Sequence, residues 1–236
     1  MLNLSVIGTS GITEKFLSAA RKTGRFKFHT VYSRTAEKGR AFAEKQGFEG
    51  FCTDINALAK DSVTNAVYIA SPNSCHFAQS KLFLQNGKHV FCEKPIVTNA
   101  AEYDELLSLA DKSGLIYAEA IMSRHYKGRD MLLNGLSQIG NISVARINFC
   151  QRSSRYDAFM AGEHMNIFDM SLCAGTLMDL GVYCVYAALD LLGKPDSICA
   201  SASFAKNGAD LSGGAVLGYK DFTAVLSYSK IGESAI

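Results

Sequence analysis

The stretch LNLSVIGTSGIT, residues 2–13, decides the fold of the first half of the chain. An apolar strand runs into a glycine turn and then into a helix, which is the context of the dinucleotide-binding motif G-x-G-x-x-G. Gly8 matches the first glycine of that motif, whereas Ser10 and Thr13 replace the other two. The turn still predicts a pyrophosphate site, because a helix N-terminus offers unpaired N–H groups and a positive dipole end. The alternative is an ordinary strand–helix turn.

Two of these positions depart from the motif. Ser10 has a small side chain, which still lets the backbone approach a pyrophosphate, and Gly11 lies out of register. Thr13 replaces the glycine that lets the helix pack closely on the strand. We expect its side chain either to loosen that packing or to donate its hydroxyl to phosphate.

Strands alternate with helices through the first 120 residues. The pattern predicts strands at 2–7, 26–32, 66–70, 88–91 and 115–118, with a weak segment around Phe51. Helices are predicted between them, at about 12–22, 36–46, 54–59, 76–86 and 99–112. This alternation is typical of α/β domains with a doubly wound parallel sheet. We expect residues 1–120 to form a Rossmann-type NAD(P)-binding domain.

The pattern changes after residue 120. A helix is predicted at 126–138, a strand at 142–150, and a long helix within 175–192. Three strands then follow without intervening helices, at 198–204, 214–219 and 222–229, which favours an antiparallel sheet. We expect residues 121–236 to form an α+β domain with an open, mostly antiparallel sheet. The loop-rich stretch 151–174 is a candidate cover for a substrate.

The end of the second predicted strand bears on the choice of cofactor. Ser33 and Arg34 follow this strand, Lys38 lies one turn into the next helix, and no acidic residue occupies 31–35. In NAD-binding domains an acidic residue here accepts a bond from the ribose 2′-hydroxyl, while an arginine accommodates the 2′-phosphate of NADP. The residues therefore favour NADP over NAD, with a helix cap and a solvated arginine as the alternative.

The next two strands of the first domain also end in polar residues. One strand ends at Ser71-Pro72-Asn73, with His76 in the helix that follows. The other ends at Glu93-Lys94-Pro95, where the proline stops the strand and leaves Lys94 at its tip. Ligands bind beyond the carboxyl ends of strands in open α/β sheets, so Lys94 is a candidate active-site residue. A surface Glu–Lys pair before a turn is the alternative.

Composition excludes several classes of function. Nearly half of the 236 residues are hydrophobic and 19% are charged, as in globular proteins. A net charge of +2 gives no sign of nucleic-acid or membrane-surface binding. The longest apolar run, residues 182–189, is too short to span a bilayer. Met1 leads directly into a strand, so no signal peptide is expected.

The seven cysteines are scattered and include no C-x-x-C pair. An odd number without such spacing argues against a complete disulfide framework and against a structural zinc site. We therefore expect a cytoplasmic protein with reduced cysteines and no metal.

One series of residues extends in order along nearly the whole chain. It comprises the Gly8 turn, Ser71-Pro72-Asn73 with His76, Glu93-Lys94-Pro95, Glu119, Arg124 and GTLMDLGVY at 175–183. This series resembles the glucose–fructose oxidoreductase/inositol 2-dehydrogenase (Gfo/Idh/MocA) family. The resemblance implies an NAD(P)-dependent oxidoreductase, a dehydrogenase or reductase of the CH–OH group of a sugar, cyclitol or similar small molecule. Family sheets usually continue through several more strands, so we expect C-terminal strands that this sequence does not include.

The resemblance also assigns roles to individual residues. Lys94 corresponds to the family's active-site lysine, and Asp179 and Tyr183 correspond to its acid and its proton-transferring residue. Placing Lys94 near Tyr183 would lower the pKa of the phenol, and a four-residue helical spacing puts Asp179 on the face of Tyr183. A helix-start acid and a core aromatic are the alternatives for Asp179 and Tyr183. His164 is the substitute proton donor if Tyr183 faces away.

The expected contacts complete this hypothesis. Cofactor contacts are expected from Gly8, Thr9, Ser10, Gly11, Ile12, Ser33, Arg34, Lys38, Ser71, Pro72, Asn73, His76, Glu93 and Lys94. For His76, capping and packing alone is the alternative. Candidate substrate contacts are Glu119, Arg124 and His164. We expect a homodimer or tetramer formed through the C-terminal sheet.

Two other functions remain open at this point. One is a dihydrodiol- or biliverdin-type reductase that acts on a hydrophobic substrate. The other is a non-catalytic, NADP-binding sensor or partner-binding module, although such a module has no need of Lys94, Asp179 and Tyr183.

Overall fold

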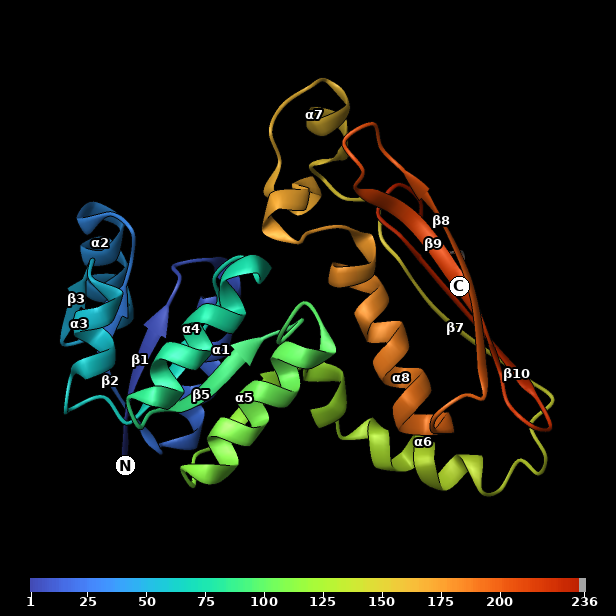
Figure 1. Ribbon diagram of the computed structural model, residues 1–236, viewed down its shortest axis with the longest axis horizontal. Helices are drawn as coiled ribbons and strands as arrows, with labels where there is room; N and C mark the ends of the chain where they lie inside the picture. Colours follow the sequence, from blue (N-terminus) through green and yellow to red (C-terminus); the bar gives the residue numbers. More distant parts are fainter. Residues whose placement is uncertain (234–236) are drawn as a thin grey trace. The chain divides into compact units, whose positions relative to one another are not determined.

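A six-stranded parallel sheet, ordered β3-β2-β1-β4-β5-β6, organises the first 120 residues (Figure 1). Its strands are β1 (Leu2–Ile7), β2 (Phe26–Tyr32), β3 (Gly50–Cys52), β4 (Ala66–Ile69), β5 (His89–Glu93) and β6 (Tyr117–Ala120). The strand order reverses between β1 and β4, and open α/β sheets bind ligands at the crevice beside such a reversal. The expected doubly wound parallel sheet is confirmed.

Helices cover both faces of this sheet. They are α1 (Gly11–Thr23), α2 (Ala36–Gln46), α3 (Ile55–Lys60), α4 (Asn73–Gln85) and α5 (Ala100–Lys112). One apolar layer joins α1 and α2 to the sheet through Leu17 and Phe42, and the other joins α3, α4 and α5 through Leu58, Phe83 and Leu106. Because both faces are covered, β4 is buried at every position from Ala66 to Ile69.

The computed structural model describes residues 1–233, which divide into two units, Met1–Ala120 and the residues from Ile121 onward. The second unit contains a four-stranded sheet, ordered β7-β10-β9-β8. Its strands are β7 (Val144–Cys150), β8 (Ser197–Phe204), β9 (Asp210–Gly218) and β10 (Thr223–Ser229). Two of the three pairings are antiparallel, as expected, but β7 pairs with β10 in parallel.

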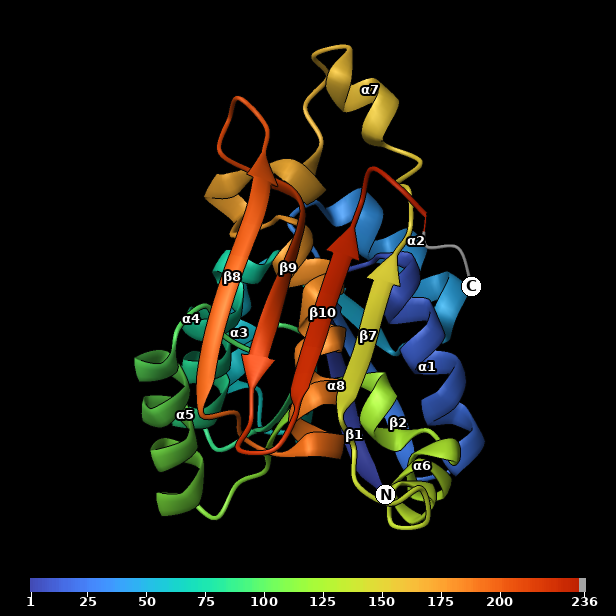
Figure 2. The same ribbon diagram turned by 90° about the vertical axis from the view of Figure 1, so that its right-hand side faces the viewer.

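A long helix of the second unit packs on one face of its sheet, and Figure 2 shows the other face uncovered, with α8 behind the strands. The short segments are η1 (Met122–His125), α6 (Gly128–Leu136), α7 (Tyr156–Met160), η2 (Asn166–Phe168) and η3 (Met170–Leu172). The long helix begins with a π-helical turn, η4 (Leu177–Gly181), and continues as α8 (Val182–Leu192). Leu180, Cys184 and Ala188 pack against the inward side chains of β9 and β10.

The segment Met170–Leu192 is long and apolar enough to cross a membrane by length and composition alone. The core helix of a soluble protein passes the same test. In this structure the segment changes from 3-10 to π to α geometry, and its inward side chains pack on the sheet. The core of the second unit therefore accounts for the inward residues of this segment, while Met170, Leu177 and Leu189 are exposed.

The uncovered face of the second sheet is less apolar than a buried face. Strand register places Asn148, Ser227, Gly214 and Ser201 in one row across it. The next row towards the other end is Arg146, Val225, Val216 and Cys199. Small and hydroxylated residues thus surround a narrow apolar centre, with Val216 46% and Val225 38% exposed.

The strand β9 begins four residues before its predicted start. The sequence LSGG at 211–214 lacks the β-branched and aromatic residues that favour strands. Pairing on both sides, with β8 and β10, makes these residues extended nevertheless. Gly214 is needed there, because a Cβ would lie 2.7 Å from the carbonyl oxygen of Leu226.

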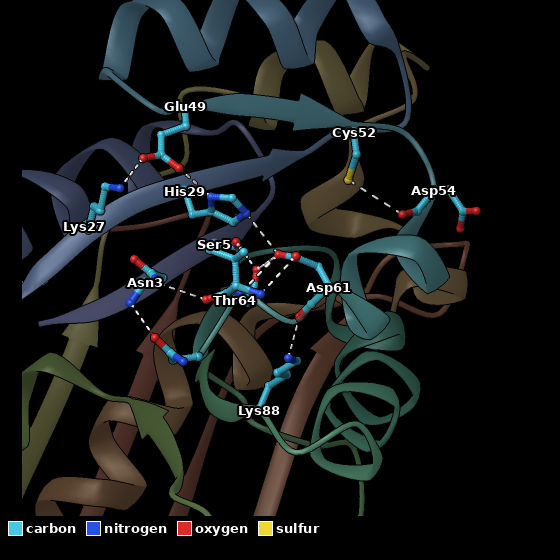
Figure 3. A network of polar contacts seen from close by, with 12 residues as sticks. Asn3, Ser5, Lys27, His29, Glu49, Cys52, Asp54, Asp61, Thr64 and Lys88 are labelled. Carbon is cyan, nitrogen blue, oxygen red and sulfur yellow. Dashed lines mark hydrogen bonds and ion pairs between the residues drawn. The ribbon is translucent and has the colours of Figure 1, made fainter.

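A polar network ties β2 to the ends of its neighbours in the first unit (Figure 3). The ring of His29 lies between two carboxylates, with Nδ1 2.7 Å from Glu49 and Nε2 3.0 Å from Asp61. Asp61 also accepts hydrogen bonds from the hydroxyl and N–H of Thr64, and its carbonyl accepts one from Lys88. Burial by itself would raise the pKa of Asp61, but these hydrogen bonds and His29 outweigh it and lower the pKa.

We predict that Asp61→Asn lowers the free energy of unfolding at pH 7 by about 1–3 kcal/mol, the usual cost of losing charge-assisted hydrogen bonds. A lowered carboxyl pKa in the folded state contributes stability above the unfolded value of about 3.9, and that stability is lost as pH falls through the folded pKa. The difference between the variant and the unmutated protein should therefore be larger at pH 7 than at pH 3.5 in urea unfolding. Exposed Asp221→Asn is the control, and an equal difference at both pH values would contradict the prediction.

Candidate functional site

Three strand ends of the first unit meet at Gly8. Its N–H donates to the carbonyl of Tyr32 at 3.4 Å, and the N–H of Ala70 donates to the carbonyl of Ile7 at 2.8 Å. Gly8 has φ +106°, and a Cβ there would lie 2.5 Å from the carbonyl oxygen of Ala70. A side chain at this position would collide with rigid main chain. Gly8 is therefore required for the ends of β1, β2 and β4 to approach one another.

The helix α1 begins directly after this turn, with Ser10 as its extended N-cap residue. The Ser10 side chain makes no capping hydrogen bond, so the first-turn N–H groups of Gly11 and Ile12 are not capped by it. Thr9, Ser10 and Gly11 form the short connection, and no atom lies within 4 Å of a Cβ added to Gly11. This end of α1 fits a pyrophosphate, which binds well to helix N-termini.

Thr13 does not take part in this anion site. Its side chain is fully buried, and its hydroxyl has no hydrogen-bond partner among the described residues. The expectation that Thr13 donates to phosphate is therefore wrong, because the residue lies on the sheet-facing side of α1. The unpaired hydroxyl is the consequence of placing threonine where the motif has glycine.

The residues after β2 form a second polar cluster at the same edge of the sheet. The N–H of Ser33 donates to the carbonyl of Cys52 at 3.1 Å, and the Ser33 hydroxyl accepts from the N–H of Thr35 at 3.4 Å. Arg34 and Lys38 are exposed. Two cations and no acidic side chain within 31–35 suit the 2′-phosphate of NADP.

The turn after β4 contributes Ser71, Pro72 and Asn73. Pro72 is the N-cap residue of α4, and Asn73 is the first residue of that helix. The Ser71 hydroxyl donates to Gln79 at 2.7 Å and so fixes the turn on the helix. This turn follows Ala70, whose carbonyl faces Gly8, and it therefore lies beside the pyrophosphate turn.

The Glu93-Lys94-Pro95 turn is held on several sides. The Tyr68 hydroxyl donates to Glu93, and the ring of Tyr68 stacks on Phe16 at 3.8 Å between centroids. The N–H of Ile96 donates to the carboxylate of Glu119 at 2.8 Å. Lys94 is half-buried at the carboxyl end of β5, where the sequence placed it. Glu93 and Glu119 thus act in this structure as supports of the turn.

His76 also supports this turn. Its ring is fully buried, with Nδ1 2.8 Å from the carbonyl oxygen of Pro95 and Nε2 2.9 Å from that of Ser71. Burial lowers the pKa of His76, and the hydrogen bonds with the two carbonyls oppose this effect. The side chain faces main chain, which favours packing over the expected cofactor contact.

Glu119 carries a raised pKa. Burial is the main cause, the nearby carboxylate of Glu93 adds to it, and the hydrogen bond from Ile96 and the charge of Lys94 oppose it. The ammonium of Lys94 therefore lies close enough to act on the carboxyl of Glu119. In this structure the carboxylate of Glu119 accepts a hydrogen bond from the main chain, and its substrate contact stays a prediction.

In the second unit, the motif at 175–183 begins with a half-buried cap. The carboxylate of Asp210, at the start of β9, accepts from the N–H of Thr176 at 2.9 Å and from that of Leu177 at 2.7 Å. Gly175 has φ +122°, and a Cβ there would lie 2.1 Å from this carboxylate. Asp210 thus caps the helix N-terminus, where a negative charge is stabilised.

The same motif continues in a π-helical turn that carries Asp179. A Cβ on Gly181 would lie 3.0 Å from the Tyr228 ring, so this glycine lets the turn pack directly on β10. The Asp179 carboxylate pairs with Lys230, whose side chain is 5% exposed. Sequence periodicity predicted an ordinary α-helix here, and π turns of this kind occur frequently at functional sites.

Tyr183 follows in the first turn of α8. It is half-buried and packs edge-on against the ring of Phe149 in β7, with centroids 5.6 Å apart. Asp179 and Tyr183 lie on either side of the boundary between η4 and α8. The prediction that Asp179 and Tyr183 share a helix face assumed α-helical spacing, whereas the segment from Leu177 to Gly181 is a π-helical turn.

Two candidate substrate residues lie elsewhere in the second unit. Arg124 lies 3.9 Å from Asp190, which Arg129 also binds through two hydrogen bonds. Asp190 is seven residues beyond Tyr183, or about two helical turns along α8. His164 is 71% exposed and bonds to Asp169 at 2.7 Å. The described contacts therefore do not bring Arg124 or His164 together with Asp179.

Sequence reasoning did not identify Lys230 or Asp210 as residues that hold the candidate site. Lys230 continues the inward row of β10, which contains Ala224, Leu226 and Tyr228 at intervals of two. A lysine on such a row requires an anionic partner, and this is the signal that would have identified it. Asp210 gave no comparable signal, because its role as a cap depends on the approach of β9 to residue 176.

Comparison with known proteins gives the chain its family. Residues 2–121 match the NAD-binding Rossmann-fold model of the Gfo/Idh/MocA oxidoreductase family, and residues 131–233 match a C-terminal domain model of the same family. The scyllo-inositol 2-dehydrogenase (NADP(+)) IolU of Bacillus subtilis is 40% identical over 234 residues, which cover 99% of this chain and 71% of that protein. The uncharacterized oxidoreductase YgjR of Escherichia coli is 38% identical over 236 residues, covering 100% and 72%.

A solved structure shows the same fold. The 3-ketoreductase KijD10 of Actinomadura kijaniata superposes with a TM-score of 0.89 at 24% identity, over 98% of this chain and 71% of that one. The Gly8 turn, the Lys94 turn and the motif at 175–183 thus lie within matched regions of a known fold. The chain belongs to the Gfo/Idh/MocA family of NAD(P)-dependent oxidoreductases.

Proposed function

We propose that the protein transfers hydride between the nicotinamide of NADP and a secondary alcohol or carbonyl carbon of a cyclitol or sugar. The observation that carries this proposal is the support of Lys94, because Glu93, Glu119 and His76 all hold the turn that presents it. The similarity to the NADP-dependent scyllo-inositol dehydrogenase favours a polyol substrate. The exposed cations after β2 favour NADP as the cofactor.

The residues at the strand ends would hold the cofactor. Gly8 and the N-terminus of α1 fit the pyrophosphate, and Ser33, Arg34 and Lys38 fit the ribose 2′-phosphate. The turn at residues 71–73 lies beside the pyrophosphate turn. When bound, NADP supplies or accepts the hydride.

Negative charge develops on the substrate oxygen as a carbonyl is reduced, and a positioned acid must supply a proton. We assign the stabilisation of that oxygen to the ammonium of Lys94 and the proton to the hydroxyl of Tyr183. Asp179, four residues before Tyr183, would orient the substrate. In the oxidative direction the same groups act in reverse.

A hydrophobic trans-diol is the second candidate substrate. The trans-1,2-dihydrobenzene-1,2-diol dehydrogenase of Oryctolagus cuniculus is 33% identical over 184 residues, which cover 76% of this chain and 54% of that protein. Exposed apolar side chains near the motif at 175–183, including Met170 and Leu177, favour this reading.

We further propose that the protein is cytoplasmic and forms a homodimer or tetramer. All seven cysteines are free, which suits a reducing compartment. The uncovered sheet face supports association, because strands β8, β9 and β10 would contribute one continuous surface around Val216 and Val225. A strictly monomeric protein at high micromolar concentration, measured by light scattering, would rule out this mode of association.

The unmutated protein should bind NADPH more tightly than NADH. Arg34→Ala should weaken NADPH binding by about 1–3 kcal/mol, the cost of losing one charge-assisted contact, and should leave NADH binding nearly unchanged. Fluorescence titration of both cofactors measures this. The matched control is Arg25→Ala, which removes an exposed arginine at the opposite end of β2. Equal affinity of the unmutated protein for the two cofactors would refute the NADP assignment.

Turnover with NADP and a panel of inositols, aldoses and a trans-dihydrodiol tests the function, and absorbance of NADPH measures it. Lys94→Met and Tyr183→Phe should each lower kcat by about 10²-fold or more. The double variant should be little worse than the worse single variant, because residues that act as a unit lose activity non-additively. NADPH binding should survive both changes. Additive losses would show that the two residues do not act in one step. A fully active Tyr183→Phe would make His164 the candidate proton donor instead.

A further inference from the structure

Lys230 is an ionisable residue inside the second unit to which the proposed reaction assigns no part. Its side chain is 5% exposed, and its ammonium pairs with the Asp179 carboxylate, which is 42% exposed. The ammonium also lies 6.0 Å from the centre of the buried Phe168 ring, within the range of a cation–π contact. A buried lysine is costly unless it is paired, so its position depends on these contacts.

The main chain of Lys230 is fixed from two sides. Its N–H donates to the carbonyl of Leu211 at 3.0 Å, and its carbonyl accepts from the N–H of Ser153 at 2.8 Å. The preceding residue, Ser229, accepts from Gln151 at 2.9 Å. These bonds extend the β10 pairing by one residue, so the inward direction of the Lys230 side chain follows from the register of the sheet.

The π-helical turn brings Asp179 to this lysine. Gly181 packs on Tyr228, which precedes Lys230 by two positions on the same inward row. The next inward position is therefore the one that meets the carboxylate of Asp179. Asp210 fixes the start of the same turn through Thr176 and Leu177. Asp179 is thus held by Lys230 of the sheet, and the turn that carries it is held at its N-terminal end by the Asp210 cap.

We infer that Lys230 is a positioning residue for the reaction, which fixes the orientation of the Asp179 carboxylate in the turn that leads to Tyr183. This inference rests on the proposed function for its catalytic consequence. Its structural part is independent of the reaction. Loss of the ion pair should destabilise the fold more when the buried ammonium is left without the carboxylate than when the half-exposed carboxylate is left without the ammonium. Removing Asp179 leaves a buried cation without this anion, whereas removing Lys230 leaves an anion that water can reach.

Thermal unfolding tests the structural part without any turnover. Asp179→Ala should lower the melting temperature more than Lys230→Met does. The double variant should melt at a higher temperature than Asp179→Ala alone, because methionine fills the space of the buried lysine without its charge. Exposed Lys220→Met serves as the control and should melt with the unmutated protein. A double variant no more stable than Asp179→Ala would overturn the inference.

Steady-state kinetics test the catalytic part. Lys230→Met should lower kcat by about tenfold or more. The KM for NADP should stay within about twofold, because Lys230 belongs to the second unit and the expected cofactor contacts belong to the first. Lys230→Arg should recover most of the loss, because it restores the charge, and Lys220→Met should have full activity. Unchanged kcat in Lys230→Met, with Asp179→Ala inactive, would overturn the positioning role. An unmutated protein without turnover on the whole panel would instead refute the proposed function and leave the unfolding result standing.

Discussion

The approach of Gly8 to the carbonyl of Ala70 is the constraint on which the first unit depends. A Cβ would lie 2.5 Å from that oxygen, so glycine alone lets β1 end where β4 ends. The two strands lie at the reversal of strand order, and their shared edge therefore holds the Gly8 turn, the 71–73 turn and, one strand further, Lys94. Each of these turns is anchored to a buried strand, and it therefore holds its groups more rigidly than an exposed loop would.

Polar contacts of buried and half-buried groups hold the turns that carry the candidate catalytic residues. His76 reaches two carbonyls, Glu119 holds the N–H of Ile96, and Asp210 caps the helix that carries Asp179. Each of these groups would be costly to bury unpaired, so each contact specifies one arrangement of its turn. Among the described residues, the buried hydroxyls of Thr13 and Ser80 are exceptions, because neither has a hydrogen-bond partner.

Sequence periodicity predicted most strands and the longer helices in their order, but not the short helical segments within 151–174. The strands at 2–7, 26–32 and 223–229 could be predicted because alternating or continuous apolar residues reflect how many faces of a strand are buried. Local pattern failed where tertiary contacts decide the geometry. The π turn at 177–181 depends on the packing of Gly181 against Tyr228, and the first residues of β9 are extended because strands pair on both sides of them. Motif matching located Lys94, Asp179 and Tyr183 but not the residues that hold them.

His76 and Lys230 show the same limit from opposite directions. His76 lies in a family-like motif and was expected at the cofactor, yet its ring is buried against main chain. Lys230 lies in no motif, yet it occupies an inward strand position and pairs with a candidate catalytic acid. A motif identifies residues by type and spacing, whereas burial decides whether a polar side chain can reach a ligand or must find a partner inside the protein. Reading the inward row of each strand for ionisable residues therefore complements motif matching, because a buried charge needs a polar partner, as Lys230 has in Asp179.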